Sequence, residues 1–280
     1  MNTLVLNKDK KKAKKDILNI VWLLIAIIII SISLFPIFWM FLSSLKTKRE
    51  AASGVFFPAN PSFEAFKLLD YTFFNSLIMT FVGALISVSL CVVINLLAAY
   101  AFARLDFHGK KYIWAIILIP MFVPGMTILV PLYLLCSELR ILDTLFVLII
   151  PGVAQATHIF FMRQFFLTVP KSLEDAAKID GANEFQLFLH IFVPLSSGPS
   201  FIVALGAFMG YWNAYLWPVL VVERESLKQI MQVVQSYRPS HDPNWPLIMA
   251  ASLIATSIPL IIYFAFNKRI VDSLKISGIK

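Results

Sequence analysis

Charged residues are scarce in this sequence. Only 14% of its 280 residues are Asp, Glu, Lys or Arg, whereas 59% are hydrophobic. Because a soluble domain carries about 25% charged residues, this composition excludes an ordinary soluble fold. A helix needs about 20 consecutive apolar residues to cross the hydrocarbon core of a bilayer. Six uncharged runs approach or exceed that length: Ile17–Leu45, Tyr71–Ala103, Tyr112–Ser137, Thr144–Met162, Phe185–Val222 and Pro243–Asn267.

Cysteine and the common catalytic motifs are equally sparse. The two cysteines, Cys91 and Cys136, stand alone in apolar surroundings, which argues against a disulfide or a metal pair. The sequence contains no His-Glu-x-x-His, no Gly-x-Ser-x-Gly and no Walker A phosphate-binding loop, since its one Gly-Lys pair, Gly109-Lys110, lacks a following Ser or Thr. We therefore predict a non-enzyme with no catalytic residue, no metal ligand and no cofactor of its own. If ATP drives this protein, another subunit must bind the nucleotide.

The uncharged runs predict an all-α membrane protein with six transmembrane helices. Proline and glycine inside the runs are compatible with this prediction, because bundled transmembrane helices tolerate both. The first run resembles a signal peptide but is too long, and no small-residue cleavage site follows it, so we expect it to remain as the first helix. The predicted division is a basic tail (1–16), the first helix with an outer loop (17–70), a five-helix core (71–267) and a second tail (268–280).

The formal net charge of +8 suggests either a nucleic-acid partner or an oriented membrane protein. If the N-terminus is cytoplasmic, 16 of the 24 Lys and Arg residues lie in inner segments and 8 in outer ones. This bias is the positive-inside rule, and inner loops also lie against anionic headgroups. The charge therefore predicts that both termini are cytoplasmic and that the partner is the bilayer, not nucleic acid.

Ionisable residues are absent from the depth of every predicted span, which argues against proton or sodium coupling. Polar residues do occur there. Asn213 follows the Gly206-x-x-x-Gly210 pair beside Tyr211 and Trp212. A polar side chain at membrane depth faces the bundle interior or a water-filled path. Small residues four apart also favour close helix packing. Both interpretations stay open for Asn213, Tyr211 and Trp212: a substrate path, or packing.

One polar segment, Lys171–Pro194, interrupts the apolar second half. It holds a quarter of the 16 acidic residues, namely Glu174, Asp175, Asp180 and Glu184. We expect Ser172 to cap a first short helix and Gly181 to end it in the left-handed conformation. Asn183 is then expected to cap a second helix, with Gln186 as the reciprocal partner.

The second helix has an apolar face made by residues at i, i+3, i+4 and i+7, which are Phe185, Phe188, Leu189 and Phe192. Pro194 interrupts the pattern before the fifth span. The prediction is a cytoplasmic helix-turn-helix between helices 4 and 5, at about 168–196. The residues alone leave two interpretations open: a connector with no partner, or a docking element whose small face (Ala176, Ala177 and Ala182) fits a protein cleft.

The order Asp175-Ala176-Ala177, Gly181 and Ile191-x-Val193-Pro194 resembles the EAA loop of the integral membrane subunits of binding-protein-dependent ABC importers. Two positions depart from that pattern: Asp175 replaces Glu, although Glu174 precedes it, and Val193 replaces Leu. Asp180-Gly181-Ala182 is similar to the form in the carbohydrate-uptake branch. Other segments resemble the maltose-transporter G-type permease, among them Ser44-Leu45-Lys46-Thr47, Ala98 to Arg104, Asp143-Thr144 and Arg163-Gln164-Phe165-Phe166.

This resemblance implies a permease subunit for sugar or oligosaccharide uptake, multi-pass in a bacterial or archaeal cell membrane. The implied partners are a second permease of the F type, two ATPase subunits that hold ATP and Mg, and an extracytoplasmic solute-binding protein. The implied ATPase-coupling residues are Glu174, Asp175, Ala176, Ala177, Asp180, Gly181, Ala182, Ile191 and Pro194. The alternatives are an ABC permease for glycerol phosphate or another solute, or a self-sufficient secondary transporter.

Overall fold

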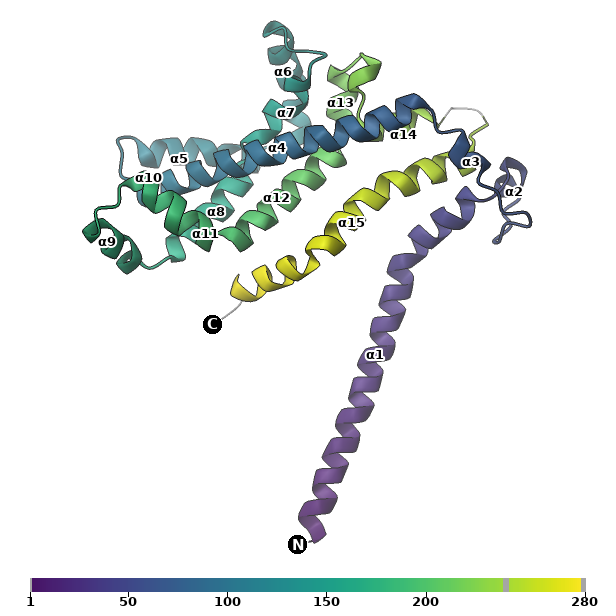
Figure 1. The fold of residues 1–280 in the computed structure, drawn as a ribbon, viewed down its shortest axis with the longest axis horizontal. Coiled ribbons are helices and arrows are strands. Elements are labelled where there is room, and N and C mark those ends of the chain that lie inside the picture. Colours follow the sequence, from purple (N-terminus) through teal and green to yellow (C-terminus); the bar gives the residue numbers. More distant parts are fainter. Residues whose placement is uncertain (1, 239–241, 278–280) are drawn as a thin grey trace. The chain divides into compact units, whose positions relative to one another are not determined.

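The computed structural model describes residues 2–238 and 242–277, and all regular secondary structure in these ranges is helical (Figure 1). This confirms the predicted all-α class. The described chain divides into two compact units. The first holds α1, α2, α3 and the start of α15 as far as Ile254, and the second begins at Leu69 and holds the elements from α4 to α14 with the rest of α15.

The first unit consists of α1 (Asn2–Ser44), α2 (Lys48–Ala52), α3 (Glu64–Lys67) and the first turns of α15 (Trp245–Ser277). Since α1 begins at Asn2, the backbone of the predicted basic tail continues the helix of the first span. The chain leaves α1 through a buried lysine, Lys46, which is 5% exposed. Its Nζ donates to the carbonyl oxygen of Val55 at 2.6 Å and lies 4.3 Å from the ring centroid of Trp39. These contacts satisfy the buried cation and fold the segment after α1 back onto the end of that helix.

The second unit is built around one long helix, α4 (Tyr71–Arg104), which packs against α7, α8 and α12 (Figure 1). The other elements are α5 (Lys110–Leu118), η1 (Ile119–Phe122), α6 (Gly125–Glu138), α7 (Leu145–Val153), α8 (Ala156–Thr168), α9 (Lys171–Ile179), α10 (Glu184–Leu187), η2 (Phe188–Phe192), α11 (Val193–Leu195), α12 (Ser197–Trp212), α13 (Leu216–Val221), η3 (Glu225–Leu227) and α14 (Ile230–Ser236).

Asn95 hydrogen-bonds to the backbone where the helix is interrupted between α7 and α8. It lies in α4, is fully buried, and faces the break between α7 and α8. Its side-chain amide donates to the carbonyl oxygen of Val153 at 2.8 Å, and its Oδ1 accepts from the backbone N–H of Gln155 at 3.1 Å. Backbone groups freed by a helix break need such partners inside a membrane.

Three described helices are long and apolar enough to cross a membrane: Leu18–Ser44, Tyr71–Arg104 and Trp245–Asn267. Three bent pairs qualify only if each counts as one span: Lys110–Phe122 with Gly125–Glu138 at 111°, Leu145–Val153 with Ala156–Thr168 at 41°, and Glu184–Leu195 with Ser197–Trp212 at 78°. The sharpest bend falls at Val123, which is extended because Pro124 follows it. The multi-pass character is confirmed, and the count of six and the orientation stay predictions.

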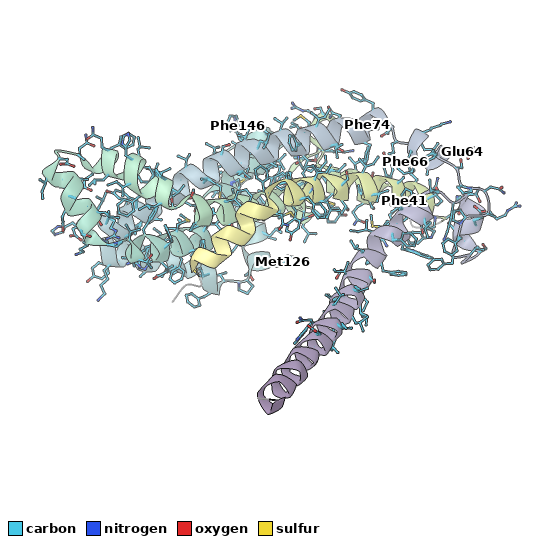
Figure 2. The ribbon with its side chains drawn as sticks, turned by 60° about the horizontal axis from the view of Figure 1, so that its bottom comes forward. Phe41, Glu64, Phe66, Phe74, Met126 and Phe146 are labelled. Atoms are coloured by element: carbon cyan, nitrogen blue, oxygen red, sulfur yellow. The ribbon has the colours of Figure 1, made fainter. Side chains whose placement is uncertain are left out.

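The outer surface of these helices is apolar, as lipid or an apolar protein partner requires. Large exposed side chains include Phe74, Met126 and Phe146, labelled in Figure 2. The most apolar stretch of Leu18–Ser44 in α1 has no residue buried against the rest of the chain. This helix therefore has its contact surface available for lipid or for another subunit.

Gly83 sets the close approach of α4 and α12. A Cβ at this position would overlap the hydroxyl of Tyr211 and lie 2.8 Å from its Cζ. We expect Gly83→Ala to lower the unfolding free energy by about 1–3 kcal/mol, as overpacking of a core does. Unfolding in mixed detergent micelles measures this loss. In a Tyr211→Leu background the same substitution should cost much less, and an equal loss in both backgrounds would contradict the contact.

Candidate functional site

The polar segment Lys171–Pro194 forms two short helical pieces around a turn, as predicted. The first piece, α9, begins at Lys171 after Pro170 and has no side-chain cap. The prediction that Ser172 caps it is wrong, because a capping residue needs a non-helical backbone and the chain is already helical at Lys171. Glu174 lies in the first turn, where a negative charge complements the helix dipole.

The turn at Gly181 is confirmed. Gly181 has φ +84°, in the left-handed region. The N–H of Ala182 bonds to the carbonyl of Ala177 at 2.9 Å, and the N–H of Gly181 bonds to that of Lys178 at 3.1 Å. This pair of bonds is the Schellman motif, which satisfies the last carbonyls of α9. It sets the direction in which the chain leaves α9.

The second helix begins as predicted and continues differently. Asn183 and Gln186 form the reciprocal capping box, with both N···O distances 2.9 Å. The predicted apolar face is partly wrong: Phe185 and Leu189 are 63% and 42% exposed, whereas Leu187 is fully buried. A π-helical turn at Phe188–Phe192 changes the register. Pro194 has no N–H to donate, and such a turn accommodates that missing bond.

Arg104, the last residue of α4, anchors α9 to the membrane core. Its Nη1 lies 2.7 Å from Oε1 of Glu174, and the two side chains are only 6% and 12% exposed. This contact lacks hydrogen-bond geometry and is an ion pair. Nη2 donates to the backbone carbonyls of Phe166 and Val169, the latter at 2.5 Å. One guanidinium therefore joins α4, the end of α8 and the first turn of α9.

Glu184 forms a second anchor at the start of α10. Its Oε2 accepts from the hydroxyl of Tyr100, in α4, at 2.8 Å. Its Oε1 lies 2.8 Å from Nζ of Lys178, in α9, where the two side chains are about half exposed. The hydrogen bond and charge of Glu184 raise the pKa of Lys178. Each of the two helical pieces is thus tied to α4 by one acidic residue, and they are tied to each other.

The remaining coupling candidates are turned outward or line a groove. Asp175, Ala176 and Asp180 are exposed. Half-buried Ala177, Ala182 and Ile191 line a groove of about 360 Å³ between the two pieces, together with Asp180, Gly181, Gln186, Leu187 and His190. Pro194 is exposed in α11. Within the predicted set, Glu174 forms the ion pair with α4, and Ile191 packs against the buried cluster that includes Tyr100 and Phe166.

The three substrate-path candidates have different surroundings. Trp212 is 1% exposed and its Nε1 donates to the carbonyl of Ala255 at 3.2 Å, so in this conformation no solute reaches its ring. Tyr211 lines a cavity of about 330 Å³ that Gln155 and Trp217 also line. Asn213, the residue after α12, lines a neighbouring hollow with Met126. The sequence analysis did not identify Trp217, which lines the same cavity as Tyr211.

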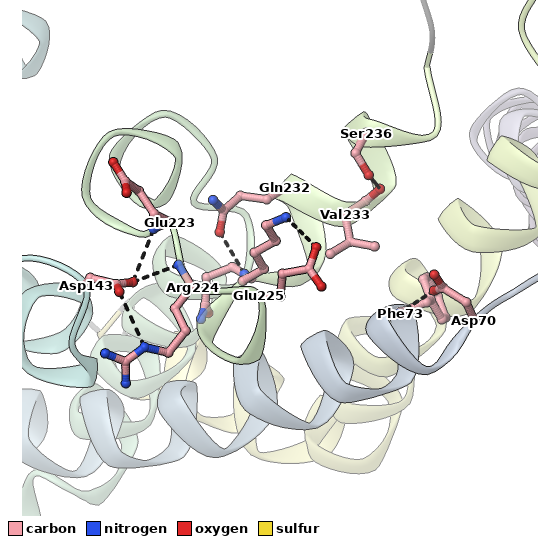
Figure 3. Close-up of polar contacts among 11 residues, drawn as sticks. Asp70, Phe73, Asp143, Glu223, Arg224, Glu225, Gln232, Val233 and Ser236 are labelled. Carbon is pink, nitrogen blue, oxygen red and sulfur yellow. Dashed lines mark hydrogen bonds and ion pairs between the residues drawn. The ribbon is translucent and has the colours of Figure 1, made fainter.

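Asp143 fastens the start of α7 to the segment after α13 (Figure 3). Its backbone N–H donates to the carbonyl of Val221 at 2.8 Å. Its Oδ1 accepts from the N–H groups of Glu223 and Arg224 at 3.2 and 2.9 Å, and Nε of Arg224 lies 3.4 Å from Oδ2. Asp143 has φ +56°, a conformation that Asp adopts more readily than most residues. These contacts close one end of the helices that line the Tyr211 cavity.

Comparisons with known proteins show the family and the fold of this chain. Residues 96–276 match the family described as the binding-protein-dependent transport system inner membrane component. The chain is 29% identical to the lactose transport system permease protein LacG of Rhizobium radiobacter, over 87% of this chain and 90% of that protein. It is 28% identical to the arabinooligosaccharides transport system permease protein AraQ of Bacillus subtilis, over 88% and 90%.

Two further matches extend the comparison. The inner membrane ABC transporter permease protein YcjP of Escherichia coli is 33% identical over 89% of this chain and 92% of that protein. Among solved structures, a bacterial ABC transporter involved in the import of the acidic polysaccharide alginate has a TM-score of 0.79 at 24% identity, covering 90% of this chain and 96% of that one, which shows a shared fold. The chain therefore belongs to the family of binding-protein-dependent transport system inner membrane components and is an ABC transporter permease.

Proposed function

We propose that this permease imports a sugar or oligosaccharide. The relatives named for lactose and for arabinooligosaccharides support the solute class. The transport path is formed together with a second permease of the F type, and a solute-binding protein delivers the sugar at the outer face. ATP and Mg are held by two separate ATPase subunits, which dock at the segment Lys171–Pro194.

The observation that carries this proposal is that one side of the segment Lys171–Pro194 is attached to α4 and the other side is exposed. Its inner side is attached to α4 by Glu174 and Glu184, while its exposed side presents Asp175, Ala176 and Asp180. A buried ion pair and a short hydrogen bond resist displacement of the segment relative to α4. Movement of an ATPase docked on the exposed side is therefore transmitted to α4, and rocking of packed helices opens or closes the path.

The cavity beside Tyr211 is the place where the sugar passes this subunit. Ligand sites in proteins are mostly apolar, with aromatic side chains and a few polar groups, and the Tyr211 cavity has that composition. Its polar side chains include Gln155 and Tyr211, and Trp217 and Tyr211 provide aromatic surface.

Site-specific cross-linking tests the docking surface. The only native cysteines, Cys91 and Cys136, are both buried. A cysteine introduced as Ala176→Cys is then the one exposed thiol. In the assembled transporter we expect a short bifunctional reagent to join it to the ATPase subunit, and Ala59→Cys, in the outer loop, to give no such product. Equal cross-linking at both positions, or none at Ala176→Cys, contradicts the docking.

Reconstitution tests the solute class. Vesicles containing the permease, its partner permease, the ATPases and the binding protein should take up a sugar in an ATP-dependent manner. A panel that includes glycerol phosphate distinguishes sugar from phosphorylated solutes. Solute flux through this chain alone, without ATP, would instead support a self-sufficient transporter.

A further inference from the structure

A further hollow lies where α4 turns into α5, apart from the segment Lys171–Pro194 and the Tyr211 cavity. It measures about 390 Å³ and is lined by Phe102, Asp106, Phe107, Lys110, Lys111, Trp114 and Arg163. Three of these side chains are cationic and one is anionic. The residues come from the end of α4, the turn that follows it, α5 and the middle of α8, so the hollow lies where these elements meet.

Within the described ranges, the cationic side chains that line this hollow have only some of their N–H groups in hydrogen bonds or ion pairs. Nε of Arg163 donates to the carbonyl of Phe102 at 3.0 Å, and the guanidinium lies 4.4 Å from the ring centroid of Trp114. Among the described residues, its terminal nitrogens have no hydrogen-bond or ion-pair partner, and the ammonium of Lys111 has none either. Asp106 does not neutralise them, because it is fully exposed and faces only Lys110, at 3.6 Å.

The surroundings of the hollow are apolar. From its rim α5 continues with Ile113 and Ile116, and η1 begins with Ile119; these side chains are 43%, 63% and 56% exposed. On α8 the neighbouring Phe160 is 37% exposed and stacks on Trp114, with ring centroids 6.3 Å apart. Tryptophan is enriched where a helix meets the headgroup region. A ligand in this hollow therefore meets unpaired cations at one end and apolar helix surface at the other.

We infer that this hollow, the Arg163 pocket, binds the headgroup of an anionic phospholipid. The phosphate accepts from the terminal nitrogens of Arg163 and from Lys111, and the acyl chains lie along the exposed apolar side chains of α5 and α8. A planar guanidinium is suited to phosphate oxygens, and basic pockets between transmembrane helices on the cytoplasmic side are where anionic headgroups bind. A free anion would make no contact with the exposed apolar side chains of α5 and α8.

Native mass spectrometry of the assembled transporter tests the inference. The complex is titrated with dioleoyl phosphatidylglycerol, with the corresponding phosphatidylcholine, and with inorganic phosphate. We expect saturable retention of phosphatidylglycerol in excess over phosphatidylcholine, with no displacement by millimolar phosphate. Lys111→Gln should weaken that binding about fivefold, since one cation near an anionic lipid surface contributes about that factor.

Two further variants complete the test. Lys171→Gln removes an exposed cation elsewhere in an inner segment and should leave binding unchanged. Arg163→Gln should weaken lipid binding more than Lys111→Gln does. Because Arg163→Gln also removes the contacts to Phe102 and Trp114, Lys111→Gln serves as the variant that leaves the fold intact. Equal retention of the two lipids, equal effects of Lys111→Gln and Lys171→Gln, or displacement by phosphate would each overturn the inference.

Discussion

Replacing Arg104 by methionine is expected to detach the segment Lys171–Pro194 from α4. The substitution leaves the Glu174 carboxylate, 12% exposed, without its cation, and removes the donor to two backbone carbonyls. Breaking a buried ion pair from one side costs about 3–5 kcal/mol. Hydrogen exchange of residues 171–182 should therefore accelerate, and solute-stimulated ATP hydrolysis by the assembled transporter should be lost.

Matched variants separate this effect from a general loss of charge. Arg49→Met removes an exposed arginine in α2 and should change neither measurement. Glu174→Gln should have a smaller effect than Arg104→Met, because Arg104 keeps its carbonyl acceptors. If the Arg104→Met transporter keeps its solute-stimulated ATP hydrolysis and hydrogen exchange in residues 171–182 stays slow, the Arg104–Glu174 ion pair does not transmit motion to α4.

Replacing Gly181 by valine is expected to abolish uptake while leaving the membrane helices folded. At φ +84° any side chain strains the backbone, by about 1–2 kcal/mol for an ordinary residue and more for a β-branched one. The space around Gly181 is open, so the effect is on backbone direction and not on packing. This strain disfavours the two hydrogen bonds that the N–H groups of Gly181 and Ala182 donate to the end of α9. The orientation of α9 relative to α10 therefore changes. We expect transport to fall at least about tenfold, the factor that corresponds to 1.4 kcal/mol.

Gly54 offers a matched control for that substitution. It has φ +73°, open surroundings and a position between α2 and α3. Gly54→Val introduces a similar backbone strain far along the chain from the segment Lys171–Pro194, and we expect transport to be unaffected. If both variants transport equally well, or both fail equally, the special role of the Gly181 turn is excluded.

Local features of this protein were predictable from the sequence. The uncharged runs determined the all-α membrane class, because an apolar run of about 20 residues has the length of a membrane-spanning helix, which satisfies its backbone groups within one segment. The Gly181 turn and the Asn183–Gln186 box were also predicted, and the structure has both. Each involves residues within a few positions of one another, where side-chain type and backbone conformation are directly linked. The start of α9 was the local exception, since Ser172 lies inside the helix.

Contacts between distant residues were decided only by the tertiary structure. The sequence showed Glu174 and Glu184 as surplus acidic residues, but their partners Arg104 and Tyr100 lie 70 and 84 positions away and come close because α4 packs beneath the segment. A simple helical period did not reveal that Leu187 is buried while Phe185 is exposed, or that a π-helical turn follows at Phe188–Phe192. Neighbouring Tyr211 and Trp212 look alike in sequence, yet adjacent residues on a helix point about 100° apart. One therefore lines a cavity and the other fills the core, and only the packing of the surrounding helices determines which.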